Sequence, residues 1–228
     1  MPEYGNFCPI ALCTEVLADR WTPLIVRELV IGSTRFNDIA RGLPGISRSL
    51  LTQRLRHLER KGVIERWPAE GRAAEYRLTD AGRDLEPLLL DFGRWAVQWL
   101  YEDLDPADVD AITLTWWMHR RIDAERLPDH RVVVQFEHTG PERVTIWMVF
   151  ERREASVCIQ PPGFEVDVVI RCTTPDLGAV FSGNDTWPHA VANGSIVVEG
   201  PPAVLRQLPR WFLWSPFTDE VRARAFAS

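Results

Sequence analysis

The sequence predicts an α+β protein with two domains, a mainly helical one followed by one built on a sheet. Apolar residues recur at helical spacing through most of residues 1–100, where two short strand-like segments interrupt them. In the second half, apolar and polar residues alternate as they do in strands. Charge divides the chain at the same place: residues 1–100 hold 14 Lys+Arg and 13 Asp+Glu (+1), whereas residues 101–228 hold 12 and 19 (−7). We therefore expect the two halves to have different partners.

Four helices are expected before the first strand. Apolar spacing sets their extent, and capping signals set their ends: Thr22 as an N-cap followed by Pro23, and Ser47 as an N-cap with Gly62 just past the last turn. The expected helices are residues 9–18, the segment from Thr22 to a stop at Gly32, residues 35–41, and the segment from Ser47 to about Lys61.

A hairpin and a long helix complete the first domain. Strands are expected over residues 63–67 and 75–78, and the tip between them is partly basic. Thr79 or Asp80 then caps a helix over about residues 81–101, whose apolar stripe is larger than a domain of this size needs for its own core. Helices followed by such a hairpin form the winged helix-turn-helix pattern.

The helix after Ser47 has the pattern of a DNA-recognition helix. Leu51, Leu55 and Leu58 share one side and are expected in the core, whereas the opposite side is polar. Residues 35–77 hold ten basic and five acidic residues (+5), which favours a DNA surface over the alternative of an ordinary solvated face. Gln and Arg can read base edges in the major groove. The expected DNA-binding residues are Arg35, Ser47, Arg48, Ser49, Thr52, Gln53, Arg56, Arg60 and, in the wing, Arg72, with Arg35 and Arg72 assigned to phosphates.

Several motifs in this half resemble the HxlR family of bacterial winged-helix regulators. They are Cys8-Pro9-Ile10, Arg20-Trp21-Thr22-Pro23-Leu24-Ile25, Arg35-Phe36-Asn37-Asp38-Ile39, Leu51-Thr52-Gln53-Arg54-Leu55 and Tyr76-Arg77-Leu78-Thr79-Asp80-Ala81-Gly82. The resemblance covers about residues 7–100. It implies a homodimeric transcription factor that reads a palindromic operator in double-stranded DNA, with the terminal helices pairing the subunits. Such a dimer presents two recognition helices about 34 Å apart, one turn of DNA.

Cys8 has two open interpretations. The resemblance implies that a cysteine at this Cys-Pro position can act as a redox or electrophile sensor, and a helix N-terminus favours a reactive thiol. The alternative is a framework cysteine packed in the dimer. A thiol-sensing regulator with a purely structural second domain is therefore an alternative function.

The second half predicts an α+β domain on a mostly antiparallel sheet. We expect a first domain over residues 1–102, a linker and connecting helix over 103–124, and a second domain over 125–228. Strands are expected near residues 132–136, 144–150, 166–172 and 195–199, and short helices over 175–183, 187–192 and 203–213. The segments 167–177 and 192–201 resemble sterol-carrier-protein-2-like (SCP2-like) domains. That resemblance implies an α/β sandwich enclosing a site for a lipid-like molecule.

Large aromatic residues are frequent in this second half. Aromatic side chains line ligand pockets, although each one taken alone is more often a core residue. The expected ligand-binding residues are Trp116, Trp117, Trp147, Phe164, Phe181, Trp187, Trp211 and Trp214. We therefore expect a hydrophobic small-molecule effector.

Other functions find little support in the sequence. The second half has no nucleophile motif, no zinc-ligand spacing and no glycine-rich phosphate loop, so we expect no enzyme activity, no metal and no cofactor. No stretch of about 18 apolar residues is present, the N-terminus lacks a secretory pattern, and four cysteines are too few for a disulfide scaffold. The expected location is cytoplasmic, at the nucleoid, with no membrane partner. A lipid carrier or enzyme that uses the winged helix only to dimerise is the third hypothesis.

Overall fold

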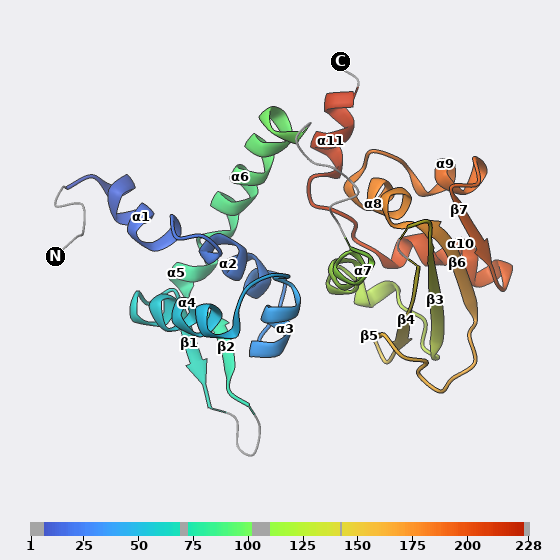
Figure 1. The fold of residues 1–228 in the computed structure, drawn as a ribbon, viewed down its shortest axis with the longest axis horizontal. Coiled ribbons are helices and arrows are strands. Elements are labelled where there is room, and N and C mark those ends of the chain that lie inside the picture. The colour runs from blue at the N-terminus through green and yellow to red at the C-terminus, as the bar shows by residue number, and fades with distance from the viewer. Residues whose placement is uncertain (1–6, 69–72, 102–109, 142, 226–228) are drawn as a thin grey trace. The chain divides into compact units, whose positions relative to one another are not determined.

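The computed structural model describes residues 7–68, 73–101, 110–141 and 143–225, and the chain forms two compact units, residues 1–92 and 93–228 (Figure 1). The boundary between the two units falls inside helix α6 (Glu86–Trp99). The domain limits expected at residues 102/103 and 124/125 stay predictions.

The first unit has the winged helix-turn-helix order of elements. Its elements are α1 (Pro9–Leu17), α2 (Thr22–Val30), α3 (Phe36–Arg41), α4 (Arg48–Arg60), β1 (Ile64–Trp67), β2 (Glu75–Leu78), α5 (Asp80–Arg83) and the start of α6. The two strands pair antiparallel from Ile64↔Leu78 to Trp67↔Glu75. One buried cluster holds the helices together, with Ile25, Ile39 and Leu51 fully enclosed. The four helices and the hairpin expected from the sequence are confirmed.

Thr22 was expected to cap α2, and this is wrong. Trp21 occupies the cap position with a left-handed backbone (φ 80°), and Thr22 is already inside the helix and buried. The Trp21 side chain packs against the core of the unit. The tight turn from α1, closed by the Thr22 amide donating to the Asp19 carbonyl at 3.0 Å, moves the helix start by one residue.

The single long helix expected after the hairpin is two helices. Thr79 caps α5 by accepting a hydrogen bond from the Gly82 amide at 3.2 Å, and α5 ends at Arg83. Pro87 has no amide hydrogen, so it cannot donate to the carbonyl of Arg83, and a continuous helix would lose that bond. The chain therefore turns before α6 begins at Glu86.

Gly82 fits a site that has no room for a side chain, and this gives a stability prediction. A Cβ atom at Gly82 would lie 2.1 Å from the backbone carbonyl oxygen of Val63. Because that oxygen accepts the Thr79 amide at 3.1 Å, it cannot move without breaking the junction between wing and helix. We expect Gly82→Ala to lower the free energy of unfolding by about 2–4 kcal/mol, measured by chemical denaturation. Ala81→Ser, at the exposed neighbouring position, is the control and should change it by less than about 0.5 kcal/mol.

The second unit is an α+β unit built on a five-stranded mixed sheet. Its strands are β3 (Val132–Thr139), β4 (Val144–Glu151), β5 (Glu154–Cys158), β6 (Val168–Thr173) and β7 (Ile196–Glu199), in the order β5-β4-β3-β6-β7. β3 and β6 run parallel, and the other three pairings are antiparallel. The sheet expected to be mostly antiparallel is thus a mixed sheet, because a parallel pair lies at its centre.

Helices cover one face of this sheet. They are α7 (Ala111–Arg120), α8 (Thr174–Ser182), α9 (Trp187–Ala192), α10 (Pro202–Gln207) and the 3₁₀ helices Ala124–Arg126 and Leu208–Trp211. The last helix, α11 (Thr218–Ala225), packs against α8. The buried cluster joins Phe136, Met148 and Ile170 of the strands to Leu114 and Leu177 of the helices. The other face is polar at its centre, where Arg171 pairs with Glu137 (2.6 Å) and Glu199 (2.5 Å).

Three elements of the second unit differ from expectation. β5 and α11 were not expected, and the helix expected over residues 203–213 stops at Gln207 and continues as a 3₁₀ turn. Pro209 explains the change of helix type, because it cannot donate the bond that a continuing α-helix needs.

Candidate nucleic-acid interface

Helix α4 presents a polar side to solvent because its apolar side is fixed in the core. Leu51, Leu55 and Leu58 are each at most 1% exposed. Ser47 caps the helix by accepting a hydrogen bond from the Leu50 amide at 3.2 Å, and Gly62 takes the left-handed conformation (φ 70°) just past its end. These three features settle the rotation and the length of α4, as the sequence predicts.

The residues expected to bind DNA lie on the opposite side of α4 or next to it. Arg35, Ser47, Arg48, Ser49, Gln53, Arg56 and Arg60 are exposed, and Thr52 is half-buried. The guanidinium groups of Arg35, Arg56 and Arg60 form no ion pair within the part of the chain that the structure describes. Cations without acidic partners are available for phosphates or base edges.

Four of these residues also make contacts inside the protein. Arg48 donates to the Asn37 side-chain oxygen at 2.9 Å, Thr52 donates to the Arg48 carbonyl at 2.8 Å, and the Ser47 and Ser49 hydroxyls are 3.1 Å apart. Arg54, on the inward side of the same helix, instead pairs with Asp19 in the turn after α1. The arginines of α4 therefore differ in how firmly they are held.

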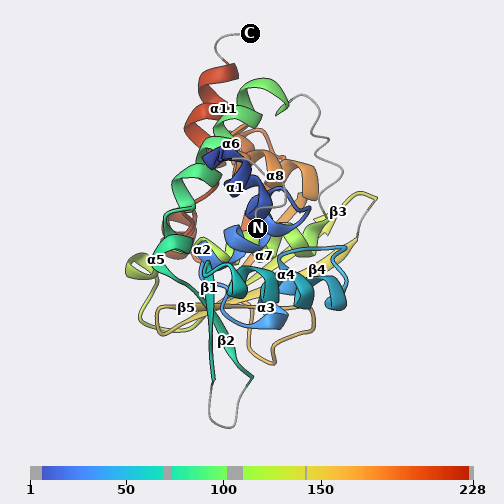
Figure 2. The same cartoon turned by 90° about the vertical axis from the view of Figure 1, so that its left-hand side faces the viewer.

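The hairpin supplies the wing beside these helices. In both views it extends beyond α3 and α4 (Figures 1 and 2). It is attached to the segment before α3, since the Tyr76 amide donates to the Thr34 carbonyl at 2.7 Å and Arg35 forms a bridge with Glu75. Arg72, the residue expected to hold a phosphate, lies outside the described residues. Arg77 pairs with Glu75 and lies over the Trp67 ring, 4.4 Å from its centre.

Large apolar side chains are exposed on α1 and on α6. The exposed side chains are Phe7, Ile10 and Leu12 near α1 and Leu88, Phe92, Trp95, Trp99 and Leu100 on or after α6. Trp95 is 57% exposed and Trp99 64%. Elsewhere around α6, Arg94 pairs with Glu220 at 3.0 Å, and the Phe217 ring leaves no space for a side chain at Gly93. Exposed aromatic residues in a row mark a surface for protein contacts.

The fold and the exposed side of α4 define a DNA-binding protein of the winged helix-turn-helix class. The family model described as HxlR-like helix-turn-helix matches residues 16–104. YvaP of Bacillus subtilis, named an uncharacterized HTH-type transcriptional regulator, is 39% identical over 109 residues, which are 46% of this chain and 97% of YvaP. The similarly named sll1512 of Synechocystis is 37% identical over 103 residues, 44% of this chain and 76% of its own.

This protein belongs to the HxlR-like helix-turn-helix family of transcriptional regulators, as its motifs predict. Among solved structures, the reduced form of the transcriptional regulator YodB of B. subtilis is 32% identical, covers 44% of this chain and 100% of its own, and has a TM-score of 0.38. The family match ends at residue 104, so the second unit is interpreted from its own residues.

The structure distributes the eight expected ligand-binding residues over several environments. Trp211 is buried, and Trp187 and Trp214 lie 6.1 Å apart between ring centres and pack with Phe181 against the same core. Trp116 is buried on α7 beside the half-buried Trp117. Trp147 donates to Gln135 at 2.8 Å on the polar side of the sheet, and Phe164 is exposed beneath Arg131. The eight residues therefore do not line one cavity together.

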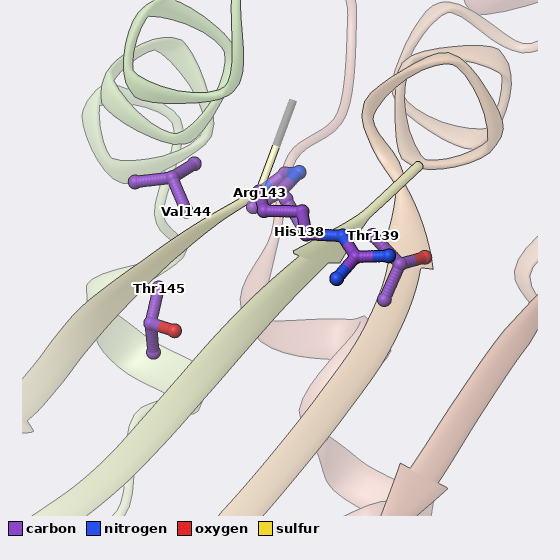
Figure 3. A pocket seen from close by; sticks show the side chains of 5 residues that line it. All are labelled: His138, Thr139, Arg143, Val144 and Thr145. Atoms are coloured by element: carbon purple, nitrogen blue, oxygen red, sulfur yellow. The ribbon is translucent and has the colours of Figure 1, made fainter. Parts of the chain in front are cut away.

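A pocket of about 310 Å³ opens instead at one end of β3 and β4. It is lined by His138, Thr139, Arg143, Val144 and Thr145 (Figure 3). The buried His138 ring contacts the Thr174 hydroxyl at 3.0 Å, and the Thr139 hydroxyl donates to the Cys172 carbonyl at 3.1 Å. None of the eight aromatic residues lines this pocket.

The cysteines differ in their access to solvent. Cys8 and Cys13 are exposed on and next to α1, whereas Cys172 is buried in the sheet. Burial raises the pKa of the Cys172 thiol to about 12, so it stays protonated at neutral pH. Cys158 on β5 is half-buried, so the two cysteines near α1 are the most accessible to thiol reagents. No cluster of three or more metal-ligating side chains occurs within the described ranges, and none of their helices has the length and apolar character of a membrane span.

Proposed function

We propose that this protein is a homodimeric, sequence-specific DNA-binding regulator whose second unit senses a hydrophobic or lipid-like molecule. The observation that supports DNA reading is the outer side of α4, where Gln53, Arg56 and Arg60 are exposed opposite a leucine side that is completely buried. Helices of this kind enter the major groove, and Arg and Gln make paired contacts to guanine and adenine edges.

The direct test is selection of bound sequences from a pool of random DNA duplexes, followed by affinity measurements at several salt concentrations. Regulation through an operator requires an enriched, two-fold symmetric sequence. It also requires an affinity that falls steeply with salt: in a plot of log affinity against log salt concentration, the slope falls by about 0.9 for each phosphate contact. No enrichment together with a flat salt dependence would favour a lipid carrier or enzyme that uses the winged helix only for dimerisation.

The exposed apolar side chains of α1 and those of α6 support the homodimer. The aromatic residues of α6 are exposed, and the same helix of a second copy would cover them. Pairing through these helices would give two copies of α4, matching a palindromic operator.

Trp211 supports an effector site in the second unit. Its indole Nε1 is buried and has no hydrogen-bond partner among the described residues, although a buried tryptophan N–H usually has one. The Phe150 and Trp211 rings are 5.1 Å apart, so a ligand reaching this nitrogen would lie against aromatic surface, which suits the lipid-like molecule that the SCP2-like resemblance implies. An effector would change DNA affinity only if it bound two poses of the dimer with different affinities. The coupling free energy in such cases is typically about 1–3 kcal/mol.

Native mass spectrometry on protein purified from a lipid-containing host tests the effector directly. A dimer with a discrete additional mass supports sensing and gives the chemical class of the ligand. An empty dimer from several hosts would contradict a tightly bound lipid-like effector.

The exposure of Cys8 at the start of α1 favours one alternative function, a thiol-sensing regulator with a structural second unit. In that case Cys8→Ser should retain DNA affinity and lose its response to oxidants or quinones, measured by DNA binding before and after treatment. A response that persists in Cys8→Ser would exclude Cys8 as the sensor. Cys13→Ser, on the same helix, is the matched control.

A further inference from the structure

We propose that Asn37 and Phe36 hold Arg48 in place for base contact, which makes Asn37 a determinant of operator sequence although it lies on the helix before the recognition helix. The inference rests on the proposed DNA-reading function. It identifies a positioning pair that was absent from the expected DNA-binding residues.

Two contacts fix the Arg48 side chain. Its Nη2 donates to Asn37 Oδ1 at 2.9 Å, and its guanidinium carbon lies 5.0 Å from the centre of the Phe36 ring. Phe36 is itself fixed, because it is half-buried against the core of the first unit. Arg48 is therefore held from two directions by α3, while it remains exposed to solvent.

The position of Arg48 suits base reading. It is the first residue of α4, and N-terminal residues of a recognition helix approach base edges. A guanidinium has five N–H donors, so one bond to Asn37 leaves others for a paired contact with guanine. A long side chain that is already ordered loses less conformational freedom on binding than one that is mobile in solution.

Arg56 and Arg60 provide the contrast on the same helix. Both are exposed, and neither guanidinium forms a hydrogen bond or ion pair with another side chain in the described part of the chain. They must be ordered by DNA itself, so a change at Asn37 should not alter their contribution. This difference separates a specific role of Asn37 from a general effect on the fold.

The experiment is a double-mutant cycle on the full-length protein, with the selected duplex and a random duplex as probes. We expect Asn37→Ala to weaken binding to the selected duplex by about three- to tenfold and to change binding to the random duplex little. The base preference lost in Asn37→Ala should be the one lost in Arg48→Ala. Combined with Arg48→Ala, Asn37→Ala should add almost nothing, whereas its effect should add fully to that of Arg56→Ala.

A salt titration gives an independent readout. Asn37→Ala removes no charge and should keep the slope of log affinity against log salt concentration. Arg48→Ala removes one cation and should make this slope shallower by about one if Arg48 also contacts a DNA phosphate. The denaturation midpoint should be unchanged in Asn37→Ala because the residue is exposed. Phe36→Leu keeps the apolar packing, removes the aromatic face, and should reproduce a weaker form of the same specificity change.

The outcomes separate this inference from the proposed function. If Asn37→Ala and Arg48→Ala add independently, or change preference at different base pairs, the positioning role is wrong while DNA reading stands. If no duplex is enriched by the wild-type protein, the proposed function itself fails.

Discussion

Replacing Gln53 and Arg56 together by alanine is expected to lower affinity for the selected operator by about 100-fold or more. Each good paired contact to a base edge contributes about 1–3 kcal/mol of discrimination, and a dimer would lose the contacts in both half-sites. Both side chains are exposed on α4, opposite the buried leucine side, so the fold should survive the change. The measurement is equilibrium binding to the operator and to a random duplex at the same salt concentration.

Arg60→Ala is the matched control for this pair. Arg60 is exposed on the same helix but is its last residue, away from the end that approaches the bases. Arg60→Ala should weaken binding to both duplexes by a similar factor and make the slope of log affinity against log salt concentration shallower by about one. Equal losses on both duplexes in the Gln53/Arg56 variant would contradict their assignment to base reading.

The sequence predicts the DNA-reading side of α4 well because three local signals agree. The spacing of Leu51, Leu55 and Leu58 sets the buried side, Ser47 sets the start, and Gly62 sets the end. Each signal acts within a few residues, so no knowledge of the rest of the fold is needed. The exposure of Gln53 and Arg56 follows from these signals.

The contact between Asn37 and Arg48 could not be predicted in this way. The two residues lie on different helices, and only the crossing of α3 and α4 brings them within 2.9 Å. The motif that contains Phe36 and Asn37 resembles the family, but spacing alone gives no reason to connect it with Arg48. The break between α5 and α6 was accessible from Pro87, whose missing amide hydrogen outweighs the apolar stripe around it.

The second unit shows the limit of alternation patterns. Alternation identifies β3, β4 and β6 and their buried residues, but it does not show which aromatic side chains meet. Trp147 bonds to Gln135 on the polar side of the sheet, whereas Trp211 lies in the core, and neither outcome follows from alternation alone. Weak apolar patterns do not predict β5 and α11. β5 is stabilised by pairing with β4, and α11 is anchored by the buried Val221.

Replacing Trp95 by aspartate is expected to convert the protein to a monomer and to lower operator affinity by about 100-fold or more. Trp95 is 57% exposed within the row of aromatic residues on α6. Burying a carboxylate without a partner at the centre of an apolar interface costs several kcal/mol, which is comparable to the stability of a typical dimer. Sedimentation equilibrium gives the oligomeric state, and DNA binding gives the consequence.

Leu213→Asp is the matched control because Leu213 is also an exposed apolar residue, at 53%, but lies on neither α1 nor α6. It should leave both the dimer and the operator affinity unchanged. The denaturation profile of each unit should be similar in both variants, since neither side chain is in a core. A Trp95→Asp protein that remains a dimer would show that α6 is not the pairing surface. A monomer that still binds the full operator tightly would show that one recognition helix is sufficient. The proposal that a dimer binds a palindromic operator would then be wrong, even though α4 reads DNA.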